Sequence, residues 1–208
     1  MSDELLSKGL DRLGISYSQK QLGQLLTMVD EIMLFNPAYR LVSNTDRDEI
    51  IIRHILDSAA AIPYFISLGK TDIVDLGTGA GFPGLVLAPF LDARLCLCER
   101  MMRRVNFLKG LIVRMGLDNV TIEAKSAEEL DGKFDIVTSR AFHVLSDCYP
   151  VMERIRRENG KIVLYKAGRK SIEEELAELS GKGYSPTSSI VGLEVPFLNE
   201  SRNLLILS

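Results

Sequence analysis

The chain has 208 residues, of which 46% are hydrophobic and 25% charged, and its formal net charge at pH 7 is −3. This length supports one well-buried domain with at most a small appendage, and the acidic balance argues against a protein that coats nucleic acid non-specifically. No apolar run approaches membrane-spanning length, the first residues lack a signal-peptide core, and the three cysteines form neither a disulfide framework nor a zinc-binding pattern. We therefore expect a cytoplasmic protein with no membrane partner.

A first long helix is predicted from apolar residues that recur at helical spacing between residues 22 and 33. Ser18 and Gln21 have the spacing of a capping box at its start. The Asn36-Pro37 pair should end the helix, because proline disrupts a continuing helix.

A second helix is predicted after Asp46, which is followed three residues later by Glu49. This helix should stop before Pro63. Residues 1–65 are therefore expected to form a helical N-terminal extension, packed on a core domain of residues 66–208.

Strand-like and helix-like segments alternate from residue 72 onward. The predicted strands are DIVDL, RLCLCE, NVTIEA, FDIVTS and KIVLYK, at residues 72–76, 94–99, 119–124, 134–139 and 161–166. Helices are predicted to begin near Pro83, Arg100, Ser126 and Phe142, and the third of these connections is either a helix or a short turn. Because strands that are separated by helices pair in parallel, the pattern indicates a doubly wound α/β sheet.

The last part of the chain departs from this alternation. Residues 188–197 and 203–208 are both strand-like, and too few residues separate them for a helix, so they should pair antiparallel as a hairpin. A mostly parallel seven-stranded sheet with one antiparallel strand is typical of class I S-adenosylmethionine-dependent methyltransferases, whereas nicotinamide-binding Rossmann domains are typically all parallel. We therefore expect a Rossmann-like class I methyltransferase fold.

The motif VDLGTGAGFPG, residues 74–84, follows the first predicted strand and opens a helix. In this context Gly77 and Gly79 permit a tight turn and a close approach of the backbone to a ligand. Asp75 can accept hydrogen bonds from amides of the loop or meet the ammonium group of an amino-acid ligand, but it would repel a phosphate. The alternative interpretation is a tight strand-to-helix turn that binds nothing.

Residues at the ends of the next two strands extend this candidate ligand site. Glu99 ends the second predicted strand, where a carboxylate typically binds the ribose hydroxyls of an adenosine. After the third strand, Ala127 would form a small apolar wall beside the adenine and Glu128 would contact the base. Alternatively, Ser126 and Glu129 cap a short helix there. Together these residues favour an adenosyl amino acid over a dinucleotide.

Arg140 emerges at the carboxyl end of the fourth predicted strand, where open α/β sheets bind their ligands. The surrounding sequence, SRAF, differs from the NPPY-like element that methyltransferases acting on exocyclic amines of bases often carry. We therefore expect an acceptor other than an exocyclic amine.

Four stretches in a fixed order resemble a known family: RHILDS at residues 53–58, the glycine motif, RRVNFL at 103–108 and TSRAF at 138–142. From about residue 20 to its end, the chain resembles the bacterial 16S ribosomal RNA guanine-N7 methyltransferases, known as RsmG and formerly as GidB. The resemblance implies a class I methyltransferase fold with a helical extension, S-adenosylmethionine as methyl donor, and a guanine of small-subunit rRNA as acceptor. The donor-binding positions that it implies are Gly77, Phe82, Ala127, Glu128 and Arg140.

The chain departs from the family pattern at several positions. Glu99 stands where the family commonly has Asp, a change that keeps the carboxylate. Arg40 and Val42 replace an Asn and a Thr, and Lys166 is followed by Ala167 where the family usually has Gly. The last three departures bear on contacts with RNA more than on the donor loop.

The implied acceptor determines which catalytic groups are needed. N7 of guanine has a free lone pair and needs no general base, so catalysis would depend on positioning N7 against the methyl group, with Arg140 orienting donor or RNA. Because the narrow major groove of an A-form stem shields N7, the target guanine should lie in a loop or be flipped out. No metal is expected. His54 and Asp57, three residues apart on one helical face, either tether the helix to the catalytic domain or line the substrate cleft.

Two groups of basic residues are candidates for binding the rRNA. Arg103, Arg104 and Lys109 should lie near the mouth of the glycine cleft, whereas Lys166 and Arg169 follow the fifth strand. The alternative interpretation is an ordinary solvated helix face.

Two other functions remain open at this point. A small-molecule methyltransferase of the same fold would not depend on RNA, and the departures from the family pattern also leave room for a donor-binding module without catalysis. The sequence has no long dimerisation stripe, so we expect a monomer.

Overall fold

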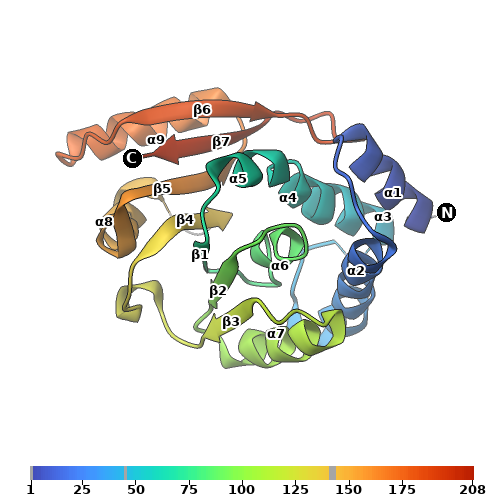
Figure 1. Ribbon diagram of the computed structural model, residues 1–208. Helices are drawn as coiled ribbons and strands as arrows, with labels where there is room; N and C mark the ends of the chain where they lie inside the picture. Colours follow the sequence, from blue (N-terminus) through green and yellow to red (C-terminus); the bar gives the residue numbers. More distant parts are fainter. Residues whose placement is uncertain (1, 45, 141–143) are drawn as a thin grey trace.

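A seven-stranded sheet forms the centre of the computed structural model, which describes residues 2–44, 46–140 and 144–208 (Figure 1). The strand order is β3-β2-β1-β4-β5-β7-β6, and β7 is antiparallel to both of its neighbours while the other neighbouring strands pair in parallel. The strands are β1 (Asp72–Leu76), β2 (Arg94–Cys98), β3 (Val120–Glu123), β4 (Phe134–Arg140), β5 (Arg156–Lys166), β6 (Ser188–Leu193) and β7 (Arg202–Leu207). The predicted mostly parallel sheet, its one antiparallel strand and its terminal hairpin are confirmed.

Helices cover both faces of the sheet (Figure 1). They are α1 (Ser2–Arg12), α2 (Gln19–Tyr39), α3 (Arg47–Ile50), the π-helix η1 (Ile51–Leu56), α4 (Asp57–Ala59), α5 (Ile62–Leu68), α6 (Gly84–Leu87), α7 (Met102–Met115), the 3-10 turn η2 (Ala127–Glu129), α8 (Leu145–Ile155) and α9 (Arg169–Gly181). Strand side chains alternate between the two faces: Ile73 of β1 joins the core under the N-terminal helices, whereas Val74 and Leu76 join the core under α8 and α9. The N-terminal helices therefore share one apolar core with the sheet.

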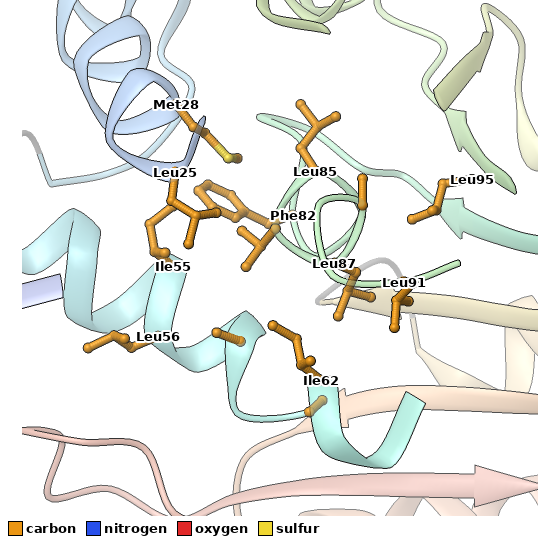
Figure 2. Close-up of a cluster of buried hydrophobic side chains, with 14 of the residues drawn as sticks. Leu25, Met28, Ile55, Leu56, Ile62, Phe82, Leu85, Leu87, Leu91 and Leu95 are labelled. Atoms are coloured by element: carbon orange, nitrogen blue, oxygen red, sulfur yellow. The ribbon is translucent and has the colours of Figure 1, made fainter. Parts of the chain in front are cut away.

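Figure 2 shows where this shared core reaches the glycine motif. Leu25 and Met28 of α2 and Ile55 of η1 gather around the ring of Phe82 (Figure 2). All of these side chains are buried, so the N-terminal helices fix one wall of the glycine loop.

The end of α2 differs from the sequence-based prediction. The capping box of Ser18 and Gln21 is confirmed at the start of the helix, but the helix continues through Pro37 to Tyr39. Beyond the helix, the side chain of Asn36 holds the backbone of Val42. Its amide donates to the carbonyl of Val42 at 3.0 Å and accepts from the Val42 N–H at 2.9 Å. This clamp fixes the chain that follows α2.

The second predicted helix stops before Pro63, as expected, since its last part, α4, ends at Ala59. Asp46 caps it by accepting a hydrogen bond from the backbone of Glu49, as predicted. Pro63 lies in the first turn of the next helix, α5, where a missing N–H is harmless. The segment Arg47–Leu68 is also long and apolar enough to cross a membrane by length and composition alone, so the expectation that no apolar run approaches that length was wrong. Its apolar residues contribute to the core described above.

One further boundary differs from the predictions, and one helix was not predicted. The strand expected over residues 188–197 ends at Leu193, because Pro196 has no N–H for a ladder and Phe197 turns with a positive φ of 66°. Helix α9 was not predicted. Helix α8 begins at Leu145, and the predicted start at Phe142 lies outside the described residues. The capping box predicted for Ser126 and Glu129 is present on the short turn η2.

Candidate functional site

Two adjoining cavities lie at the carboxyl ends of the parallel strands. The smaller, of about 210 Å³, is lined by the end of β2 and by η2. The larger, of about 830 Å³, is bounded by residues 41–43, by η1, by the glycine motif and by the ends of β4 and β5. A third cavity of about 650 Å³ lies near the amino ends of β1 and β2, away from the glycine motif. Ligands of open α/β sheets bind at the carboxyl ends, so the first two cavities form the candidate site.

The backbone of the glycine loop takes conformations that favour glycine. Gly77 and Gly79 have φ values of 64° and 61°. The N–H groups of Gly77 and Thr78 donate to the carbonyl of Cys98, at 2.9 and 3.3 Å, which ties the loop to the end of β2. A Cβ at Gly84 would clash with the side chain of Leu97, so the absence of a side chain lets the helix that follows pack closely on the sheet. The loop is therefore held in one shape at the rim of both cavities.

Asp75 stabilises the glycine loop through hydrogen bonds. Its Oδ2 accepts from the hydroxyl of Thr78 at 2.6 Å and from the N–H of Gly84 at 2.9 Å. The residue is only 1% exposed, and burial raises its pKa to about 7. Asp75 lines neither of the two cavities, so the structure places it as a brace for the loop. Direct contact with a ligand stays a prediction.

Glu99 lies on the wall of the smaller cavity, as its position at the end of β2 led us to expect. Its carboxylate accepts hydrogen bonds from the N–H of Gly79 at 3.1 Å and from the N–H of Met101 at 2.8 Å. Each oxygen keeps a further lone pair, so the group can accept hydroxyl donors while it holds the loop.

Ala127 and Glu128, two of the donor-binding residues predicted from the sequence, line the smaller cavity together with Gly77. The sequence did not indicate how their loop is held: Arg154 of α8 donates to the carbonyl of Glu128 at 2.9 Å and to that of Ala127 at 3.4 Å. The two interpretations of this stretch, a ligand-contacting loop and a capped short helix, are compatible, because the capped turn η2 itself forms part of the cavity wall.

Arg140 is the centre of a polar network on the wall of the larger cavity. Its Nη1 donates to Asp57 Oδ2 at 3.0 Å and to the carbonyl of Arg53 at 3.1 Å, and its Nη2 lies 2.9 Å from His54 Nδ1. Its guanidinium also lies 4.7 Å from the centre of the Phe82 ring, on which the imidazole of His54 stacks at 5.1 Å. The polar tether predicted for His54 and Asp57 is present, and both residues also line the cavity.

His54 is a hydrogen-bond acceptor in this network. Burial, followed by the charges of Arg140 and Arg53, lowers its pKa to about 4. Because an arginine can only donate, Nδ1 must accept and the proton of the neutral ring lies on Nε2. The lone pair of Nδ1 is therefore already used by Arg140.

Two residues that sequence reasoning did not identify lie on β7 and β5. Arg202, at the start of β7, donates from Nε to Asp57 Oδ1 at 3.0 Å, so Asp57 holds two arginines at once. The hydroxyl of Tyr165 donates to the carbonyl of Ser58 at 3.0 Å. These residues are distant in sequence from the motifs, and no local pattern marks them.

The predicted RNA-binding residues fall into two groups. Arg103, Lys109 and Arg169 are exposed and line neither cavity. Arg104 lines both cavities, and Lys166 lines the larger one while its ammonium group bonds to Glu175. Arg104 and Lys166 are thus cavity residues, whereas the other three lie on the outer surface.

Within residues 2–44, 46–140 and 144–208, no group of three His, Cys, Asp or Glu side chains is placed to hold a metal ion.

Comparison with known proteins agrees with this geometry. The family model of GidB, the rRNA small subunit methyltransferase G, matches residues 21–205. The chain is 35% identical to the ribosomal RNA small subunit methyltransferase G of Treponema denticola, over 100% of this chain and 94% of that protein. It is 36% identical to the protein of that name from Cronobacter sakazakii, over 97% and 96% of the two chains. Its fold resembles magnesium protoporphyrin IX methyltransferase from Synechocystis with bound SAM, with a TM-score of 0.59, 13% identity and coverage of 92% and 98%. The chain belongs to the rRNA small subunit methyltransferase G family.

Proposed function

We propose that this chain transfers the methyl group of S-adenosylmethionine to N7 of a guanine in small-subunit rRNA, acting as a monomer in the cytoplasm. The observation that carries the proposal is the pair of cavities joined at Gly77. One is lined as an adenosine requires, and the other is wide enough for a nucleotide base beside it. The names of the chain's relatives in the methyltransferase G family support small-subunit rRNA as the acceptor.

The chain's own residues fit this donor. Glu99 offers free lone pairs to ribose hydroxyls, Ala127 gives a small apolar wall for the adenine, and Gly77 leaves the backbone open at the junction. S-adenosylmethionine, when bound, supplies a methyl group on a positively charged sulfur. The protein then has to hold this group in line with the attacking atom and exclude competing nucleophiles.

The residues around the larger cavity suit an acceptor that loses no proton. N7 of guanine attacks with its own lone pair and carries no hydrogen. The imidazole of His54 is neutral and its Nδ1 accepts from Arg140, so it acts as a positioning group. Arg140 and Phe82 form a fixed wall against which a base can be oriented. This arrangement favours positioning over acid–base catalysis.

The exposed residues Arg103, Lys109 and Arg169 support an RNA partner as phosphate contacts outside the cavities. A large substrate is needed to reach all three from the cleft.

Radiolabelled methyl transfer tests the proposal. The acceptors are small ribosomal subunits, protein-free small-subunit rRNA, large subunits and guanosine nucleotides, with Arg140→Ala as the inactive control. We expect label only in the small-subunit acceptors. Methylation of free nucleotides would indicate a small-molecule methyltransferase, and donor binding without transfer to any acceptor would indicate a non-catalytic module.

A further inference from the structure

Arg104 occupies a place that its neighbours in the basic run do not share. It lies in the first turn of α7, where its N–H donates to the carbonyl of Met101 at 2.8 Å. Among the described residues, only Gly77 and Arg104 line both cavities. A ligand that extends from the smaller cavity into the larger one must therefore pass between them.

The guanidinium of Arg104 is incompletely paired within the described chain. Its Nε is buried and has no hydrogen-bond partner there. The carboxylate of Glu99 is 3.7 Å from Nη1, a distance too long for a good hydrogen bond, and already accepts two backbone N–H groups. By contrast, Arg140 and Arg202 both donate to Asp57 at 3.0 Å. A buried donor without a partner is costly, so a bound ligand that supplies an acceptor would be favoured.

The charge of the proposed donor limits which of its groups can meet Arg104. S-adenosylmethionine carries a positive sulfonium and a positive ammonium group, both of which a guanidinium repels. Its α-carboxylate is its one anionic group and matches the planar fork of an arginine. An RNA phosphate is less suitable, because it is attached to a strand outside the cavities. The exposed Arg103, which lies 6.0 Å from the ring of Tyr39, is better placed to meet such a phosphate.

We infer that Arg104 is a donor-binding residue, which holds the α-carboxylate of S-adenosylmethionine at the junction of the two cavities. This assignment rests on the proposed function, and it moves Arg104 from the RNA surface into the donor site. The carboxylate, held there, would fix the direction in which the donor crosses from one cavity to the other.

Calorimetric titration without RNA tests the inference with two ligands. S-adenosylhomocysteine has the carboxylate, whereas 5′-methylthioadenosine keeps the adenosine and sulfur but lacks the amino-acid end. Arg104→Met should weaken binding of S-adenosylhomocysteine by roughly 10- to 100-fold, the range for a hydrogen bond to a charged group. Binding of 5′-methylthioadenosine should change less than about threefold. The matched control Arg103→Met should leave both affinities unchanged.

Other outcomes separate this inference from the proposed function. Equal losses for both ligands would overturn it, because Arg104 would then act through Glu99 or the shape of the cavity. Unchanged affinity for S-adenosylhomocysteine together with weakened rRNA binding would also overturn it and return Arg104 to the RNA surface, with the proposed function intact. A wild-type chain that binds neither ligand would overturn both. If Arg104→Met does not fold, Arg104→Lys carries the test, with a selective loss again expected for S-adenosylhomocysteine because lysine lacks the fork.

Discussion

Replacing Asp57 by asparagine should destabilise the protein and disturb the larger cavity at the same time. Asp57 Oδ2 accepts from Arg140 at 3.0 Å and its Oδ1 from Arg202 at 3.0 Å. The Asp57→Asn substitution keeps the shape but removes the negative charge, and its new N–H groups would face one of the two guanidinium groups. Two cations would then lie close together with no shared counterion.

The size of the effect follows from the burial of the three side chains. That of Asp57 is 7% exposed, and those of Arg140 and Arg202 are 17% and 21% exposed. Breaking a fully buried ion pair costs about 3–5 kcal/mol, and because these guanidinium groups retain some contact with water we expect about 2–4 kcal/mol. For a chain of this size, 3 kcal/mol corresponds to a fall in Tm of roughly 6–12 °C.

Urea unfolding followed by circular dichroism measures this loss directly. The control is Glu174→Gln, which removes an exposed contact to Lys170 at 3.9 Å and should be indistinguishable from wild type. If Asp57→Asn behaves like that control, Asp57 does not hold the two arginines and the account of the network is wrong.

Three further predictions concern the donor, the RNA and the mechanism. Gly77→Val should abolish donor binding, because Gly77 has a φ of 64° that a β-branched residue rarely adopts. Wild-type affinity for the donor, measured by calorimetry in a folded variant, would contradict the assignment of the glycine loop to the donor site. Reversing Arg103 and Lys109 to Glu should weaken rRNA binding and flatten its salt dependence by about one unit of slope per lost contact, with donor affinity unchanged; filter binding over a salt series would show an unaltered slope if these residues only face solvent. Because the pKa of His54 is lowered to about 4, titration of His54 should not change single-turnover rates between about pH 6 and 9. Asp75, whose pKa is raised to about 7, titrates in that range and acts through the glycine loop, so the result that would contradict the lone-pair mechanism is a steep limb that disappears in His54→Gln.

Local signals in the sequence predicted most of the fold. The capping boxes at Ser18 and Ser126 depend on residues three positions apart, and both are present. The alternation of strands and helices, together with the short final connection, predicted the mixed sheet. The expected end at Asn36-Pro37 was wrong because the rule that proline ends a helix locates the boundary only approximately, and α2 ends at Tyr39.

The candidate site was predictable only in part, because charge alone does not give side-chain direction. Arg103 and Arg104 are adjacent basic residues, but about 100° separates their directions on a helix. A signal was present: Arg104 precedes the buried Leu108 by four residues and Leu111 by seven, which puts it on the inward side of α7. No comparable signal joins Asp57 to Arg202, since 145 residues separate them.

Identification of the methylated atom tests the central claim most directly. Small-subunit rRNA is incubated with the protein and S-adenosylmethionine, digested to nucleosides and analysed by mass spectrometry against authentic methylated guanosines. We predict one new methyl group per rRNA, recovered as 7-methylguanosine and absent with Arg140→Ala. A methyl group recovered on an exocyclic amine or on a ribose hydroxyl would contradict the account, because those acceptors must lose a proton and the proposed mechanism includes no general base.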